Sequence, residues 1–404
     1  MIAARPQPAQ GHFRTPLMET PFHPRLAALA ETNDWYGWAG MKSLHSVYDE
    51  ELEYFAIRST AALFDISPMA KYRVRGPGSE AMLNRLTLRD VRKLAPGRVH
   101  YTAWCDDEGH VLDDGTLFRL APDDFRLCCQ GRHLPWLLDT AEGFDCTVTD
   151  ETDEVAGLAL QGPCSFAVLA AAGFTGAETL KPFQLRDFPH EGGRVTISRT
   201  GFTGDLGYEL FVAADAALTL WDRLWSAGQP LRLKAIGYNA LNRARIEAGF
   251  IVAGADFTPA DQAIRTDRVR MPDEIGLDWM VDLTKSAFTG RRAIAAARAK
   301  GTLKHILVGL DIADNTPAEG AIVYHRGKRE AGVVSAAIWS PTLKRNIAIA
   351  SLDRPYGSRL TDDLWVEIYA LRELRYAKLM KPARIVPRPF LTLPRRSATP
   401  PGRF

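Results

Sequence analysis

The stretch from residue 98 to residue 129 constrains the fold most, because it reads as three antiparallel strands joined by tight turns. Apolar and aromatic residues at 101–105 precede a turn at 107–109, β-forming residues resume at 110–120, and a turn at 122–124 leads into residues 125–129. The middle strand carries two adjacent carboxylates, Asp113 and Asp114, although aspartate is disfavoured inside strands. An exposed edge strand, a bulge and a functional site are the three explanations left open at this point.

Length and composition indicate a folded protein with more than one domain. The chain has 404 residues, with 46% hydrophobic and 24% charged residues, which is ordinary for a globular protein. A formal net charge of +2 provides no basic field for nucleic acid. The five cysteines include no CxxC pair, so we expect no metal site, and no apolar run reaches the ~18 residues of a membrane span. We therefore expect a cytoplasmic protein without nucleic-acid or membrane partners.

Helices and strands alternate along most of the chain, and strands alone follow near its end. Helical spacing of apolar residues recurs at 46–59, 134–141, 214–227 and 235–248, with β-forming segments at 61–67, 72–74, 146–148 and 155–161. This mixture predicts α+β layers. Short strands then recur at 306–311, 321–324, 331–335, 347–352, 365–369 and 375–379. Such regular spacing predicts a separate all-β barrel or sandwich.

A glycine-rich turn at residues 195–212 carries a further carboxylate. Gly201, Gly204 and Gly207 lie between two β-rich ends, and a dinucleotide-binding loop has similarly spaced glycines. That loop leads into a helix, whereas residues 208–212 continue as a strand, so a nicotinamide site is disfavoured. Glu209 lies in this strand, and the residues alone leave open whether it is a surface residue or part of a site.

Taken in order, these motifs resemble the aminomethyltransferase family, which includes the T-protein of the glycine cleavage system and tetrahydrofolate-dependent demethylases. The resemblance covers nearly the whole chain. It rests on RSTAALFDIS at 58–67, Tyr101 twelve positions before Asp113, QGP at 161–163, RTGFTGDLGYEL at 199–210, RIEAG at 245–249, FTGR at 288–291 and SPTL at 340–343. It implies an α+β, three-lobed cloverleaf fold that binds folate at its centre, with a C-terminal all-β barrel.

We expect this fold to divide the chain into six parts. They are an extended N-terminal arm at 1–25, a first α+β lobe from 26–55 plus 151–260, a second α+β lobe with the Asp113 meander at 56–150, a connecting loop and helix at 261–304, the β-barrel at 305–386, and a tail at 387–404 that has no core signal.

The resemblance also implies roles for individual residues. Asp113 matches the family's catalytic carboxylate beside the reacting folate nitrogens, and Glu209 matches the acid that binds the amino-pyrimidine edge of the pterin. That edge presents adjacent N–H donors, which a carboxylate accepts in two parallel hydrogen bonds. A positioned aspartate can manage the proton at the leaving heteroatom. The remaining predicted folate-binding residues are Tyr101, Phe202, Trp279 and Arg245.

Two departures from the T-protein pattern bear on the one-carbon donor. Pro68 replaces a histidine, and Leu241 replaces the first arginine of the family sequence ARDTLRLEAG. A pocket without that arginine suits an apolar or cationic methyl donor, although Arg243 or Arg265 could compensate and the loop at 265–273 could shape the donor pocket.

We therefore predict a methyltransferase that moves a methyl group from a small N-, O- or S-methyl compound to tetrahydrofolate. One alternative is the aminomethyltransferase of the glycine cleavage system, whose partner would be a lipoyl carrier protein. Others are a non-catalytic folate-binding protein of the same fold and a detached folate subunit that serves an amine dehydrogenase.

Overall fold

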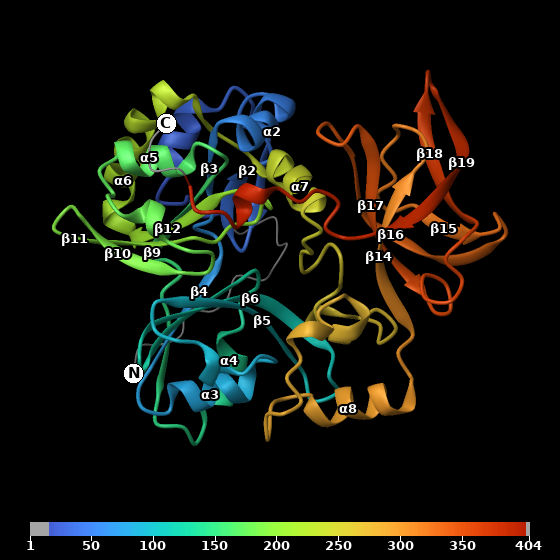
Figure 1. Cartoon of the computed structure of the whole chain (residues 1–404), viewed down its shortest axis with the longest axis horizontal. Coiled ribbons are helices and arrows are strands. Elements are labelled where there is room, and N and C mark those ends of the chain that lie inside the picture. Colours follow the sequence, from blue (N-terminus) through green and yellow to red (C-terminus); the bar gives the residue numbers. More distant parts are fainter. Residues whose placement is uncertain (1–15, 401–404) are drawn as a thin grey trace.

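The computed structural model describes residues 16–400, which form two α+β lobes and a closed β-barrel around a common centre (Figure 1). The predicted α+β cloverleaf is therefore confirmed. Residues 1–15 of the expected arm lie outside the described residues. Among residues 16–400, no helix is long and apolar enough to cross a membrane.

The first lobe is built on a six-stranded sheet. Its order is β10 (Leu185–His190), β11 (Gly193–Ser198), β12 (Gly207–Ala213), β9 (Val155–Gln161), β3 (Ala61–Asp65) and β13 (Leu233–Ala235). All neighbours are antiparallel except β3 and β13. Its helices are α1 (His23–Leu29), α2 (Glu50–Ser59), α5 (Ser165–Ala171), α6 (Ala217–Gly228) and α7 (Tyr238–Glu247), and a hairpin of β1 (Trp35–Trp38) and β2 (Met41–Leu44) lies beside them.

Alternation along the strands gives this sheet two buried faces. Leu210 in β12 packs into a core shared with α5 and α6. Its neighbour Phe211 points the other way, into a cluster that includes α2, α7 and side chains of the second lobe. Phe211 meets Phe118 of the second lobe edge to face, with ring centroids 5.3 Å apart. Glu209 has the same parity as Phe211 and therefore faces the second lobe.

Two predicted boundaries of the first lobe are wrong. The segment at 56–65 was assigned to the second lobe, but α2 and β3 belong to the first, because β3 hydrogen-bonds to β9. The end of the predicted arm is folded as well, since Phe22 is fully buried in the core of the first lobe and α1 begins at His23. One apolar residue and a two-turn helix are too short to produce a periodic signal.

The second lobe contains the predicted meander. Its antiparallel sheet has the order β5 (Arg98–Cys105), β6 (Val111–Ala121), β7 (Asp124–Cys129), β4 (Ala70–Arg75) and β8 (Thr147–Asp150), and α3 (Ser79–Leu86) and α4 (Leu134–Ala141) pack into its core. A register shift pairs Trp104 with Asp113 but Cys105 with Val111. Leu112 is thus the extra residue of a β-bulge next to the two aspartates.

The barrel is closed, so it has no free sheet edge. Its order is β14 (His305–Ile312), β17 (Arg345–Asp353), β16 (Arg329–Ser340), β15 (Ile322–His325), β18 (Leu364–Arg372) and β19 (Arg375–Val386). All six strands were predicted, five with shorter bounds and β15 shifted by one residue. The connecting segment contains α8 (Arg291–Lys300) and the 3₁₀ turns η5 (Ala260–Gln262), η6 (Pro272–Glu274) and η7 (Asp278–Met280). Further 3₁₀ turns are η1 (Val91–Lys93), η2 (Ala177–Thr179), η3 (Ala214–Ala216), η4 (Gln229–Leu231) and η8 (Pro394–Arg396).

The tail is an integral part of the first lobe, which the sequence analysis did not predict. After β19 the chain returns from the barrel to the first lobe (Figure 1). Leu391 donates its backbone N–H to Glu247 O at 2.9 Å. Arg395 donates to both carboxylate oxygens of Asp205, at 2.6 and 2.8 Å, and to Arg58 O at 2.9 Å. These partners are distant in sequence, so a segment without regular structure gives no local sign of them.

Candidate active site

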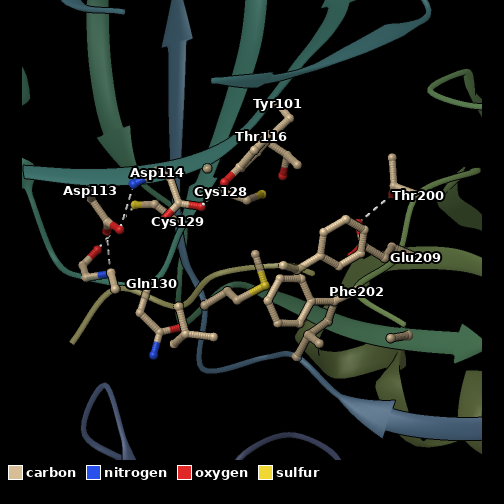
Figure 2. Close-up of a pocket in the computed structure, with 18 of the residues that line it drawn as sticks. Tyr101, Asp113, Asp114, Thr116, Cys128, Cys129, Gln130, Thr200, Phe202 and Glu209 are labelled. Atoms are coloured by element: carbon tan, nitrogen blue, oxygen red, sulfur yellow. Dashed lines mark hydrogen bonds between the residues drawn. The ribbon is translucent and has the colours of Figure 1, made fainter. Parts of the chain in front are cut away.

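A cavity of about 3090 Å³ lies between the two lobes and the tail. Its walls come from strands of both lobes, from the turn at 199–209, from residues 248–255 and 275–279, and from Arg388, Pro389 and Arg396 of the tail. Ligand pockets usually occupy about 300–1,000 Å³. This cavity therefore has room for a large ligand together with a second, smaller one. Figure 2 shows the part of the cavity that contains Asp113, Asp114 and Glu209.

Asp113 is held in the wall of the cavity by hydrogen bonds. It is 1% exposed, and its Oδ2 accepts from Gly131 N at 2.8 Å and lies 3.0 Å from His133 Nε2. Its Oδ1 accepts from Asp114 N at 2.8 Å. On β6 it has the parity of Leu117, a member of the second lobe's own core. Both oxygens of Asp113 are thus already occupied by protein groups.

Asp114 is the carboxylate on the side of β6 that faces the first lobe. It shares that side with Thr116 and with Phe118, which packs against the first lobe. Tyr101 donates its hydroxyl to Asp114 Oδ2 at 2.7 Å, and Figure 2 shows Tyr101, Asp114 and Thr116 together. Burial, followed by the nearby charge of Asp113, raises the pKa of Asp114 to about 7. A carboxyl group with this pKa can gain or lose a proton at neutral pH.

Asp113 was predicted to carry the chemistry, whereas this geometry supports Asp114. The two residues are adjacent, so the same motif match accommodates either. What separates them is which side of β6 meets the first lobe. Burial and the adjacent Asp114 raise the pKa of Tyr101 well above its usual value, so the tyrosine remains a hydrogen-bond donor.

Glu209 lies across the cavity from the aspartates. It is 8% exposed, and its Oε2 accepts from Thr200 Oγ1 at 2.5 Å. No donor from residues 16–400 contacts its Oε1 within hydrogen-bonding distance. Burial raises the pKa of Glu209, and the bond from Thr200 opposes that shift. A buried carboxylate with one unoccupied oxygen is prepared to accept hydrogen bonds from a ligand. Thr200 was not among the residues predicted from the sequence.

Two motifs of the sequence combine to position Glu209. Gln161, at the end of β9, is fully buried inside the turn that precedes β12. Its Nε2 donates to Tyr208 O at 3.2 Å, and its Oε1 accepts from Thr203 Oγ1 at 2.9 Å. A Cβ at Gly201 or Gly207 would come within 2.1 or 2.2 Å of Gln161 Oε1. These glycines are therefore required by the close approach of the glutamine side chain.

The predicted aromatic residues line the same cavity. Phe202 stacks on Phe250 with ring centroids 5.4 Å apart. Trp279 is 60% exposed, and its ring lies 6.3 Å from that of Tyr101. An exposed tryptophan beside a cavity offers a flat apolar surface to a ligand. The structure thus brings Tyr101, Phe202 and Trp279 together with the acids, as predicted.

Comparison with known proteins identifies the family. Residues 26–285 match the family described as the GCVT N-terminal domain, and residues 306–391 match the glycine cleavage T-protein C-terminal barrel domain. The chain belongs to the aminomethyltransferase family. It is therefore an enzyme of a family of tetrahydrofolate-dependent transferases.

Individual relatives of this family member carry two different names. An aminomethyltransferase from Lysinibacillus sphaericus is 32% identical over 359 residues, covering 87% of this chain and 94% of the relative. A trimethylamine-oxide aldolase from Ruegeria pomeroyi is 34% identical over 365 residues, but these cover 87% of this chain and only 45% of the relative. The glycine cleavage system aminomethyltransferase T from Bartonella henselae has a similar structure, with a TM-score of 0.80, 26% identity, and coverage of 93% of this chain and 98% of that one.

Arg245 does not line the cavity, so the geometry does not support its predicted role in folate binding. It is 2% exposed and donates to Asp256 Oδ2, to Asn242 Oδ1 at 2.7 Å and to Phe250 O at 3.0 Å. Asp256 also accepts from Ser335 Oγ of β16 at 2.6 Å. The pair of Arg245 and Asp256 therefore links α7 to the barrel. Helix α7 turns this arginine toward the barrel, and a buried arginine needs such a carboxylate.

Of the two positions that depart from the T-protein pattern, only Leu241 lies at the cavity. Leu241 lines the cavity and is 7% exposed, whereas Pro68 does not line it. Arg243 pairs with Glu50, away from the cavity lining. Arg265 forms an exposed pair with its neighbour Asp267, and residues 265–273 contribute nothing to the lining. Neither arginine thus compensates for Leu241.

Proposed function

We propose that this enzyme transfers a methyl group from a small N-, O- or S-methyl compound to tetrahydrofolate. One observation carries the proposal. Two carboxyl groups with different surroundings face one cavity, one prepared to accept hydrogen bonds and the other able to exchange a proton at neutral pH. Binding of a pterin edge and transfer to a folate nitrogen require these two abilities.

Glu209 is the residue that we assign to the pterin. The amino-pyrimidine edge presents two adjacent N–H donors, and Glu209 offers an unoccupied Oε1 beside an Oε2 that already accepts from Thr200. Thr200 fixes the rotation of the carboxylate and leaves further acceptor capacity on Oε2. Phe202 and Tyr101 provide the apolar sides of the pocket.

Asp114 is the residue that we assign to proton transfer. When a neutral donor gives its methyl group to N5 of tetrahydrofolate, the bond from carbon to the donor heteroatom breaks and a bond from carbon to N5 forms. N5 loses one proton and the donor heteroatom gains one. With a pKa of about 7, Asp114 can accept the first proton and supply the second. Tyr101 holds the carboxyl group in place by its hydrogen bond. Asp113 acts through Asp114, since its negative charge raises the pKa of its neighbour.

Leu241 supports a free methylated donor rather than a carrier-bound aminomethyl group. It presents an apolar surface where the T-protein pattern has arginine, and the cationic groups nearest in sequence are engaged elsewhere. An apolar wall accommodates a methyl-bearing group, and an ionised Asp114 favours one that is cationic.

A second candidate is the aminomethyl transfer of glycine cleavage. It is favoured by the name of the Lysinibacillus sphaericus relative and by the similarity to the Bartonella henselae structure. In that reaction the donor is carried by a lipoyl protein.

The deciding experiment incubates the enzyme and tetrahydrofolate with methylamines, methoxyaromatics or methylsulfonium compounds, and separately with an aminomethyl-lipoyl carrier. Mass spectrometry follows 5-methyl- and 5,10-methylene-tetrahydrofolate. We expect 5-methyl-tetrahydrofolate from one of the free compounds, with Asp114→Asn inactive but still able to bind folate. Methylene-folate and ammonia from the carrier alone would replace our proposal by the glycine-cleavage reaction.

A further inference from the structure

Arg388, in the tail, brings a positive charge to the cavity without a matching acid. Arg388 lines the cavity, and its guanidinium makes two long hydrogen bonds, from Nη1 to Gly249 O at 3.5 Å and from Nη2 to Leu307 O at 3.4 Å. Both distances lie beyond the usual range for N–H···O bonds. No carboxylate of residues 16–400 pairs with it within 4.0 Å. Since a guanidinium has five N–H donors, most of its capacity remains available.

Three glycines form a slot that holds this arginine. A Cβ at Gly276 would come within 2.7 Å of Arg388 Nη2, one at Gly309 within 2.9 Å of its Cγ, and one at Gly249 within 3.1 Å of its Cβ. Gly276 and Gly249 also have positive φ angles of 75° and 70°. The three contacts lie along the side chain from its base to its tip. The absence of side chains at these three positions thus keeps the path of the Arg388 side chain clear.

The nearby acid Asp256 does not neutralise the charge of Arg388. Asp256 influences Arg388, but Asp256 Oδ2 accepts from Arg245 and from Val252 N, and its Oδ1 accepts from Ser335. Asp256 therefore already has a cationic partner in Arg245, and it forms no ion pair with Arg388. Burial lowers the pKa of Arg388, which reflects the unfavourable environment of this cation. Such a charge is unfavourable without an anionic partner.

We propose that Arg388 binds a carboxylate of a ligand in this cavity, with two N–H groups of the guanidinium directed at the two carboxylate oxygens. A guanidinium matches the planar geometry of a carboxylate better than any other side chain. Two sources have this chemistry, the glutamate end of tetrahydrofolate and a carboxylate on the methyl donor. The identity of the ligands rests on the proposed function, whereas the anion site itself rests on the cavity and its unpaired charge.

The test compares tetrahydrofolate with tetrahydropteroate, which lacks the glutamate and is otherwise identical. Calorimetry measures both affinities for the wild type, Arg388→Gln and Arg388→Lys. Arg384→Gln serves as the control, because Arg384 is an exposed arginine of β19, four residues before Arg388, and pairs with Asp311 of the barrel. If the folate glutamate is bound, Arg388→Gln weakens tetrahydrofolate binding by about 10- to 100-fold and leaves tetrahydropteroate unchanged. Arg388→Lys then recovers part of the loss.

A second arm tests the donor. If its carboxylate is bound instead, Arg388→Gln leaves both folate affinities unchanged but raises the KM for N,N-dimethylglycine about 10-fold or more, without the same effect on dimethylamine. The inference is overturned if Arg388→Gln has a wild-type melting temperature and changes neither ratio. These are the ratio of affinities for tetrahydrofolate and tetrahydropteroate and the ratio of KM values for N,N-dimethylglycine and dimethylamine. If Arg388→Gln does not fold, the same ratios are measured for Arg388→Lys. A smaller change in one ratio then supports the inference, and no change in either ratio overturns it. Failure of the wild type to bind either folate would instead reject the proposed function.

Discussion

Replacing Asp114 by asparagine should stabilise the folded protein at alkaline pH while it abolishes turnover. The pKa of Asp114 is 3.8 in an unfolded chain and about 7 in the folded protein. Above pH 7 the carboxyl is ionised in both states, and the difference of about three pKa units lowers stability by ~4 kcal/mol. At pH 5 the carboxyl is protonated only in the folded state, so stability is lowered by less than ~2 kcal/mol. Below pH 4 the carboxyl is protonated in both states, and this loss of stability disappears. Asparagine removes this loss and still accepts the hydrogen bond from Tyr101.

The measurement is thermal unfolding of the wild type and Asp114→Asn at pH 5 and pH 8. Whole melting curves are compared, because a protein with three lobes need not unfold in a single step. We expect the variant to exceed the wild type by several degrees at pH 8 and by less at pH 5. Asp113→Asn is the matched control, and it should destabilise at both pH values, because Asp113 accepts from two backbone N–H groups. An equal effect of Asp114→Asn at both pH values would refute the raised pKa.

Three further outcomes are expected. Glu209→Gln should weaken tetrahydrofolate binding by ~1–3 kcal/mol in calorimetry, because the amide offers one acceptor where the carboxylate offers two; unchanged affinity would remove Glu209 from the pterin site. Ending the chain at residue 386 should lower the melting temperature, since it removes the pair of Arg395 with the buried Asp205; an unaltered melting curve would show that the tail is dispensable. Arg245→Met should lower the free energy of unfolding by ~3–5 kcal/mol, because Asp256 loses the arginine with which it pairs. The folded variant should bind folate normally in calorimetry. Selective loss of folate binding would support the role first predicted for Arg245.

Local features of the sequence were sufficient for the meander and for the six short strands near the end of the chain, whereas a barrel and a sandwich were both left open until the family resemblance favoured a barrel. Turn residues between alternating β-forming segments predict hairpins, because each hairpin is formed by residues close in the chain. The glycines at 201–207 were likewise read correctly as a turn into a strand. The need for glycine at these positions became clear only from the fold. The side chain of Gln161, 40 residues before Gly201, leaves no room for a Cβ at Gly201 or Gly207.

Contacts between distant segments decided the remaining features. The sheet to which β3 belongs depends on its hydrogen bonds to β9, the tail is held by Asp205 and Glu247, and Arg245 finds its partner in a loop that also contacts the barrel. None of these partners lies within a window in which hydrophobic period or turn composition can be read.

The two aspartates separate most clearly what the sequence determines from what the tertiary structure decides. The sequence by itself determines that Asp113 and Asp114 are neighbours in a strand, and strand geometry requires them to point to opposite sides. It does not determine which side meets the other lobe. The tertiary structure decides this, because Phe118 packs against Phe211 and places Asp114 on the same side, while Leu117 lies with Asp113 toward the second lobe's own core. Alternation is a local property of the backbone, whereas the identity of the buried side depends on which elements pack together.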